Sequence, residues 1–255
     1  MKKVYTILAM GCGLLIQACD KKDNQNESFG SVKLTFENTV GDEPLRLSDG
    51  QQNVYFTTPN NESYTVTRYG YYVTNIELIN DKGEAYGREE FDCLVFQGFE
   101  DTYNYQFDSI PEGVYTHIQC TLGVDSIYNV SGAQAGVLDP LHGMFWDWNT
   151  GYIMAKLEGY SPQSSGVNNM ISFHLGGYAA PYSVVKKVKL ALPTPLEIKK
   201  DRVPLIQLRS DVNKWFAGEQ PISFEQIYSI MEIGAEAAMM AERYKHHLSV
   251  KAVNN

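Results

Sequence analysis

Residues 64–78 read Tyr-Thr-Val-Thr-Arg-Tyr-Gly-Tyr-Tyr-Val-Thr-Asn-Ile-Glu-Leu, a stretch dense in β-branched and aromatic side chains. Such side chains fit the pleated surface of a sheet better than a helix. Asn80-Asp81-Lys82-Gly83 follows directly and carries the residue types of a tight turn. This stretch therefore predicts a long strand that ends in a turn.

The same signal recurs on both sides of that strand. Val32, Leu34 and Phe36 alternate with polar neighbours, which is the period of a half-buried strand. Further strand-like segments lie at residues 93–99, 103–107, 114–124, 151–158, 170–175, 184–192 and 196–199. Short strands with turn signals every 8–12 residues or so indicate an all-β chain. We expect a β-sandwich, immunoglobulin-like or related, over residues 31–200.

Composition supports this class and excludes others. The 255 residues include Tyr 17, Phe 11 and Trp 3, an aromatic load that suits strands. The formal net charge is −9 and no basic stripe is present, which argues against a nucleic-acid partner.

The N-terminus has the features of an export signal. Lys2 and Lys3 precede an apolar run at residues 4–16, which is too short to span a bilayer but suits a signal peptide. The run ends in Leu15-Ile16-Gln17-Ala18-Cys19, which resembles the lipobox of bacterial lipoproteins. We expect a signal peptide at 1–18, a lipidated Cys19 and a polar tether at 19–30. The protein is then an outer-membrane lipoprotein of the cell envelope, facing the periplasm or the cell surface.

Residues 201–255 predict a helical extension packed on the sandwich. A short helix is expected at 211–216, and Ser223 and Gln226 have the spacing of a capping box for a longer helix reaching about Lys245. Thioether and imidazole both suit copper, and this region holds Met231, Met239, Met240, His246 and His247. The more common arrangement is packing by the methionines, with both terminal histidines exposed to solvent.

Two cysteines remain in the exported domain. Cys93 and Cys120 lie in separate predicted strands, and the exported setting permits a disulfide between them. Buried thiols that act as small apolar side chains are the alternative.

The chemically richest segment is residues 138–152. Within seven positions it holds His142, Met144, Trp146 and Trp148, bracketed by turn signals. A second histidine, His174, follows in Phe173-His174-Leu175-Gly176-Gly177. If Phe173 faces the core, alternation turns His174 to the opposite face of the strand.

Several motifs resemble one family. They are Gly-Met-Phe-Trp-Asp-Trp-Asn-Thr-Gly-Tyr at 143–152, Lys-Leu-Glu-Gly at 156–159, Phe-His-Leu-Gly at 173–176, Tyr-Tyr-Val-Thr-Asn-Ile at 71–76 and Gly-Val-Asp-Ser at 123–126. Together they resemble the MbnP-like family, over about residues 32–192. The resemblance implies a β-rich exported domain that holds copper, as Cu(I) or Cu(II), through histidines and a tryptophan oxidised to kynurenine. It also implies a diheme, cytochrome c peroxidase-like partner.

The resemblance points to particular ligands. Neutral imidazoles of His142 and His174 suit copper, and Met144 could add a thioether. Either Trp146 or Trp148 would be the modified residue, because ring opening turns an indole into an amine that can bind metal. Asp147 is a candidate partner that orients an imidazole.

We expect a lipid-anchored protein that binds copper without catalysis, for uptake, storage or delivery. The sequence holds no Gly-x-Ser-x-Gly elbow, Walker loop, dinucleotide fingerprint or His-Glu-x-x-His helix, so an enzyme is not expected. Two alternatives without metal remain. The tryptophans and Tyr152 could be core or rim aromatics with His142 capping a turn, or exposed aromatics could bind a glycan or a partner protein.

Overall fold

The chain folds into two packed β-sheets, as the sequence predicts. The structure, a computed structural model, describes residues 28–87, 92–146 and 151–255. The smaller sheet is mixed, because β1 pairs in parallel with β12 and antiparallel with β2 and β7. Its strands are β14 (Leu248–Asn254), β12 (Leu205–Asp211), β1 (Phe29–Val40), β2 (Glu43–Pro44) and β7 (Asn104–Pro111).

The larger sheet is built around the long strand that the sequence predicts at residues 64–78. That strand is β4 (Ser63–Asn80), and its pairing registers place β9 and β8 along one edge and β3, β6 and β5 along the other. The other strands are β3 (Tyr55–Thr57), β5 (Ala85–Gly87), β6 (Asp92–Phe96), β8 (Gly113–Leu122), β9 (Ile153–Tyr160), β10 (Met170–Gly176), β11 (Lys186–Ile198) and β13 (Ser229–Ile230).

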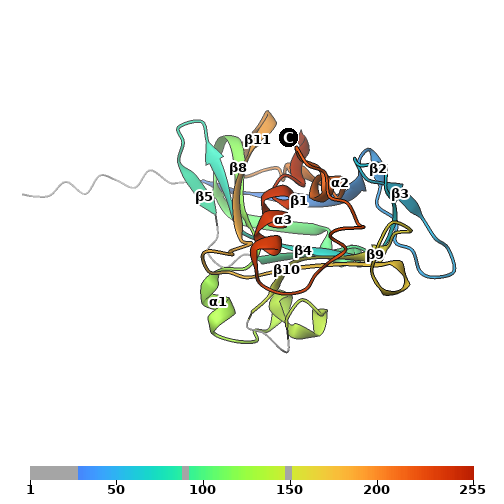
Figure 1. The fold of residues 1–255 in the computed structure, drawn as a ribbon. Coiled ribbons are helices and arrows are strands. Elements are labelled where there is room, and N and C mark those ends of the chain that lie inside the picture. The colour runs from blue at the N-terminus through green and yellow to red at the C-terminus, as the bar shows by residue number, and fades with distance from the viewer. Residues whose placement is uncertain (1–27, 88–91, 147–150) are drawn as a thin grey trace, which may run out of the picture.

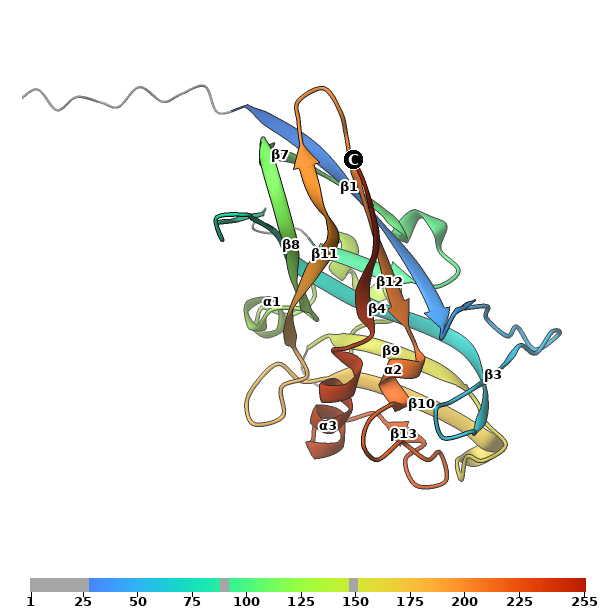
Figure 2. The same ribbon diagram turned by 90° about the horizontal axis from the view of Figure 1, so that it is seen from above.

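The hydrophobic core lies between the two sheets. Val32, Leu34 and Phe36 of β1 are buried while the residues between them are more exposed, as the alternation predicts. Seen from above, β1, β12 and β14 lie across the strands β4, β9 and β10 (Figure 2). Packing of this kind buries one face of each sheet and leaves the opposite face of β9 and β10 to be covered by loops.

Short helical segments cover the open parts of the larger sheet. They are α1 (Ser126–Val130), α2 (Asn213–Phe216), α3 (Ala235–Tyr244) and the 3-10 turns η1 (Glu100–Thr102), η2 (Gly136–Leu138), η3 (Pro140–His142) and η4 (Val167–Asn169). In Figure 1, α1 and the chain that follows it form a lobe at the bottom of the molecule. Among the described residues, no helix has the length and apolar character needed to cross a membrane.

The C-terminal segment holds the predicted helix but is not helical throughout. Residues 201–255 also supply two strands of the smaller sheet, in which β12 pairs with β1 and β14 pairs with β12. The predicted long helix is present only as α3, which begins well after Ser223. The Ser223 hydroxyl and the Phe224 amide both donate to the Glu62 carboxylate, so the expected helix cap is used in a tertiary contact instead.

Candidate metal centre

Four polar side chains gather on one face of the larger sheet, at strands β4, β9 and β10. Lys156 pairs with His174, and Glu158 pairs with Arg68, so alternation places these side chains on the same face. Leu157 and Phe173 point the other way, and Phe173 packs against the aromatic core. We call Arg68, Lys156, Glu158 and His174 the polar cluster. The prediction that His174 faces away from Phe173 is consistent with this register.

His174 is the most constrained member of the polar cluster. Its side chain is 8% exposed, and its Nε2 lies 2.7 Å from Oε1 of Glu158. Its Nδ1 is buried and hydrogen-bonds to no atom of the described chain. An unsatisfied buried polar atom is uncommon in native proteins and calls for a physical explanation.

Glu158 determines which nitrogen of His174 carries the proton. The hydrogen bond from His174 is the main cause that lowers the pKa of Glu158, with smaller contributions from the charges of His174, Lys156 and Arg68. An ionised carboxylate only accepts hydrogen bonds, so Nε2 must donate. A neutral His174 then presents the Nδ1 lone pair, the form that binds a metal ion.

Lys156 ties the loop at residues 136–146 to the sheet. Its Nζ donates to the backbone carbonyl of Gly143, although the residue is only 4% exposed. Burial is the main cause that lowers the pKa of Lys156, with the positive charge of Arg68 adding to it and Glu158 opposing it. The loop therefore lies over Lys156, which pairs with His174 on the adjacent strand.

Trp146 reaches the same strand as His174. It is 1% exposed, and its six-membered ring lies so close to Gly176 that a side chain there would collide with it. Gly176 is two residues after His174 on β10, and the register of β10 against β9 shifts between Leu175 and Gly176. Trp146 therefore lies against the strand that carries His174, and its role as a ligand stays a prediction.

His142 lies on the outer side of the loop. It ends η3, where the Asp139 carboxylate accepts from the Leu141 amide and Gly143 (φ 69°) turns the chain. Its Nε2 lies 3.0 Å from the carbonyl oxygen of Gly136. This contact fits the alternative in which His142 serves a turn.

The predicted pair of histidines is not assembled into one site in this structure. No three His, Cys, Asp or Glu side chains within the described residues are grouped so that they could hold a metal ion. His174 already contacts Glu158, so His142 does not join these two. The physical reason is local, because the His142 ring is held by its own loop. The residues shown therefore supply one well-defined imidazole donor rather than a complete coordination shell.

Comparison with known proteins identifies the family. The sequence model of the MbnP family matches residues 29–232. The chain belongs to the MbnP family. The solved structure of MbnP from Methylosinus trichosporium is similar with a TM-score of 0.50 and 14% sequence identity, over 82% of this chain and 83% of that one. At that identity the likeness shows the shared fold alone. None of the curated proteins matches the chain.

Other predicted site residues of this MbnP-family chain have mixed outcomes. Met144, two residues before Trp146, is fully buried in the hydrophobic core. Asp147, Trp148 and Cys19 lie outside the described residues. The partners of His174 were missed, because Lys156 and Glu158 were considered only as part of a family motif. Their alternation with Ala155 and Leu157 was the signal that they share a face.

The disulfide alternative for Cys93 and Cys120 is wrong for this structure. Cys120 is a free, buried thiol, and burial raises its pKa to about 12. Val73 of β4 pairs with Cys93 on one edge and with Leu122 on the other, so β4 separates the two cysteines. Strands on either side of a third are about 9.6 Å apart, beyond the roughly 7 Å that a disulfide spans between Cα atoms.

The C-terminal histidines were both predicted to be exposed, which is correct for His246 and wrong for His247, while Met240 is buried and Met231 is exposed. His247 is buried, with Nδ1 bonded to Ser210 and its ring stacked on Tyr244. The thioether of Met239 accepts from Arg243, and that of Met231 accepts from Ser172. These sulfur atoms have separate partners, as the packing alternative predicts.

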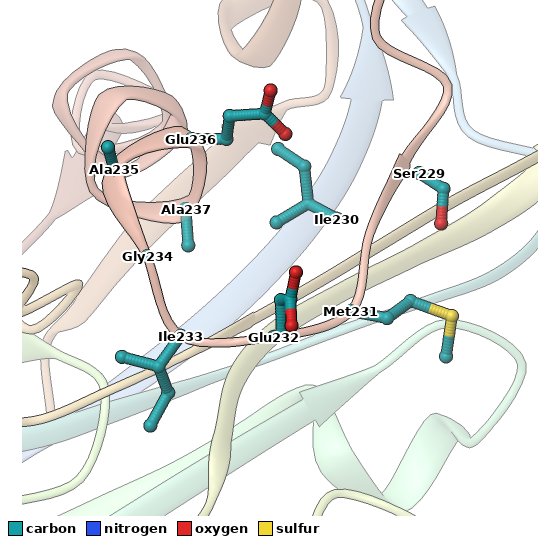
Figure 3. A pocket seen from close by; sticks show the side chains of 9 residues that line it. All are labelled: Ser229, Ile230, Met231, Glu232, Ile233, Gly234, Ala235, Glu236 and Ala237. Atoms are coloured by element: carbon teal, nitrogen blue, oxygen red, sulfur yellow. The ribbon is translucent and has the colours of Figure 1, made fainter.

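Two hollows lie on the surface, one beside the C-terminal helix α3 and one beside the loop that carries His142. One, of about 510 Å³, is lined by residues 229–237 at the start of α3. Figure 3 shows that Glu232 and Glu236 are its acidic side chains, and its lining includes no histidine or cysteine. The other, of about 420 Å³, is lined by His142 and Leu141 of the loop, by Arg68 and by aromatic residues that include Phe96 and Phe99. Arg68 belongs to both this second hollow and the polar cluster, whereas His174 and Glu158 do not line the hollow.

Proposed function

We propose that this protein binds copper without catalysing a reaction, and that His174 is the anchoring ligand. The observation that carries the proposal is the buried Nδ1 of His174, which has no hydrogen-bond partner while Nε2 is held by Glu158. Carboxylate–histidine pairs of this kind orient an imidazole toward a metal and raise its basicity. The MbnP family is associated with copper, which supports the choice of metal.

Trp146 supplies the second ligand in this proposal. An intact indole has no in-plane lone pair for a metal, whereas oxidation to kynurenine provides an aniline-type amine. Trp146 lies against Gly176 on the strand that carries His174, which supports this assignment over a tryptophan remote from the imidazole. A diheme, cytochrome c peroxidase-like partner would carry out the oxidation. His142, Met144 and Trp148 remain predictions as further ligands.

We also propose that the protein acts at the cell envelope. The lipobox-like sequence that ends at Cys19 supports a lipid anchor in the outer membrane, with the polar tether at 19–30 holding the domain away from the bilayer. Such a placement fits a task in copper uptake, storage or delivery.

Competition titration with a Cu(I) chelator tests the ligand assignment. His174→Ala should weaken copper binding at least about tenfold, since even a residue that only supports a metal ligand contributes a factor of about 10–100. His117→Ala is the matched control, because His117 lies on β8 and bonds to Thr116. Equal affinities in wild-type protein and His174→Ala would exclude His174 as a ligand.

A further inference from the structure

Two tyrosines flank one threonine across three neighbouring strands. Thr65 of β4 pairs with Tyr55 of β3 on one side and with Tyr160 of β9 on the other. Residues paired across strands point to the same face of a sheet, and strands on either side of a third are about 9.6 Å apart. The two phenol rings therefore stand on either side of a small side chain, and Figure 1 shows β3 and β9 at the same end of the molecule.

The space between these rings is an open cleft. Tyr55 is 59% exposed and Tyr160 is 46% exposed. A hollow of about 280 Å³ lies there, and its lining residues are Asn53, Tyr55, Thr65, Tyr160, Ser161, Pro162 and Asn169. We call these residues the tyrosine cleft.

The floor and one wall of the tyrosine cleft are fixed by hydrogen bonds. The Tyr160 amide donates to the Thr65 hydroxyl, which in turn donates to the Tyr160 carbonyl. Asn169 donates from its side-chain amide to the Pro162 carbonyl. Neither tyrosine hydroxyl bonds to another residue of the described chain. Two preorganised aromatic faces are thus left with their polar ends available to a ligand.

The chemistry of the lining selects a neutral, polyhydroxylated ligand. No lining residue carries a charge, so a phosphate or carboxylate would lose its hydration without gaining a counter-charge. The negative face of an aromatic ring attracts the partly positive C–H groups of a sugar ring, and asparagine amides both donate to and accept from hydroxyl groups. We propose that the tyrosine cleft binds pyranose rings of a neutral oligosaccharide.

This site is separate from the proposed copper ligand. Tyr160 follows Glu158 by two residues on the same face of β9, yet no residue of the polar cluster lines the tyrosine cleft. Trp146 is buried, so a glycan platform made from that tryptophan is excluded, whereas the tyrosines are exposed. Sugar binding and copper binding should therefore respond to different substitutions.

Calorimetric titration with maltoheptaose, cellohexaose and mannohexaose tests the proposal. We expect at least one of these oligosaccharides to bind, and both Tyr55→Ala and Tyr160→Ala to weaken that binding by about tenfold, as loss of an aromatic contact does. Tyr182→Ala is the control, since Tyr182 is 42% exposed but lies outside the tyrosine cleft. Absence of binding by all three oligosaccharides would overturn the proposal, as would unchanged binding in both cleft variants. Copper affinity should stay unchanged in these variants whichever result is obtained.

Discussion

At Gly176 the backbone of β10 lies directly against the indole of Trp146. A methyl group there would overlap the six-membered ring, so Gly176→Ala must displace Trp146 or shift the strand. We expect a loss of about 1–3 kcal/mol in the free energy of unfolding, with a change in tryptophan emission. Gly113→Ala, on β8, is the control because its added methyl would meet only ordinary contact. Equal stability and equal emission in both variants would contradict this packing.

Glu158 gives a second test at the scale of single residues. Glu158→Gln keeps the shape of the side chain but removes the charge that fixes the proton on Nε2 of His174. We expect copper affinity to fall by about 10–100-fold in a Cu(I) competition assay. Glu77→Gln, which changes a carboxylate on β4 that bonds to Gln119, should leave affinity unchanged. An equal loss in both variants would point to net charge rather than to the imidazole.

At the scale of elements, Lys156 connects the loop at 136–146 to β9. Lys156→Met retains most of the apolar stem but removes the donor to the Gly143 carbonyl. We expect faster amide hydrogen exchange in this loop, measured by mass spectrometry, with little change in the exchange of β9. Lys187→Met, at an exposed lysine, should leave the loop unaffected. Unchanged loop exchange in Lys156→Met would show that other contacts hold the loop.

Elements with a clear period of two could be predicted from the sequence. The strand at 64–78 appears as β4 with nearly the same bounds, and the alternation of Phe173 and His174 gave their opposite faces. The strands β12 and β14 were missed because β12 depends on pairing with β1, which is distant in sequence, and β14 in turn depends on pairing with β12. The partnership of His174 with Glu158 was missed for the same reason, since it follows from the β9–β10 register.

For the whole molecule, the buried His247 predicts acid sensitivity. Burial lowers its pKa from 6.5 to about 3, so the unfolded chain binds more protons between these values. The contribution of His247 to the free energy of unfolding should be fully present above about pH 6.5. It should fall by several kcal/mol as the pH drops toward 3. The lowered pKa of Glu242 acts in the same direction at the lower end of this range.

His247→Phe separates this effect from the carboxylates. Phenylalanine can keep the stacking on Tyr244 and the contact with Tyr71, while Ser210 and Tyr69 can still bond to each other. We expect the difference in melting temperature between pH 7.5 and pH 4.5 to shrink in this variant. A difference as large as that of the wild-type protein would assign acid sensitivity to other groups.

Copper coordination by Nδ1 of His174 is tested most directly by nitrogen NMR of histidine-labelled protein, before and after addition of Cu(I), which is diamagnetic. Before copper, His174 should be protonated on Nε2, the nitrogen that faces Glu158. On addition of copper, the Nδ1 resonance of His174 should shift strongly while Nε2 retains its proton. A proton on Nδ1 in the copper-free protein, or an unchanged Nδ1 resonance at saturating copper, would contradict the proposed site.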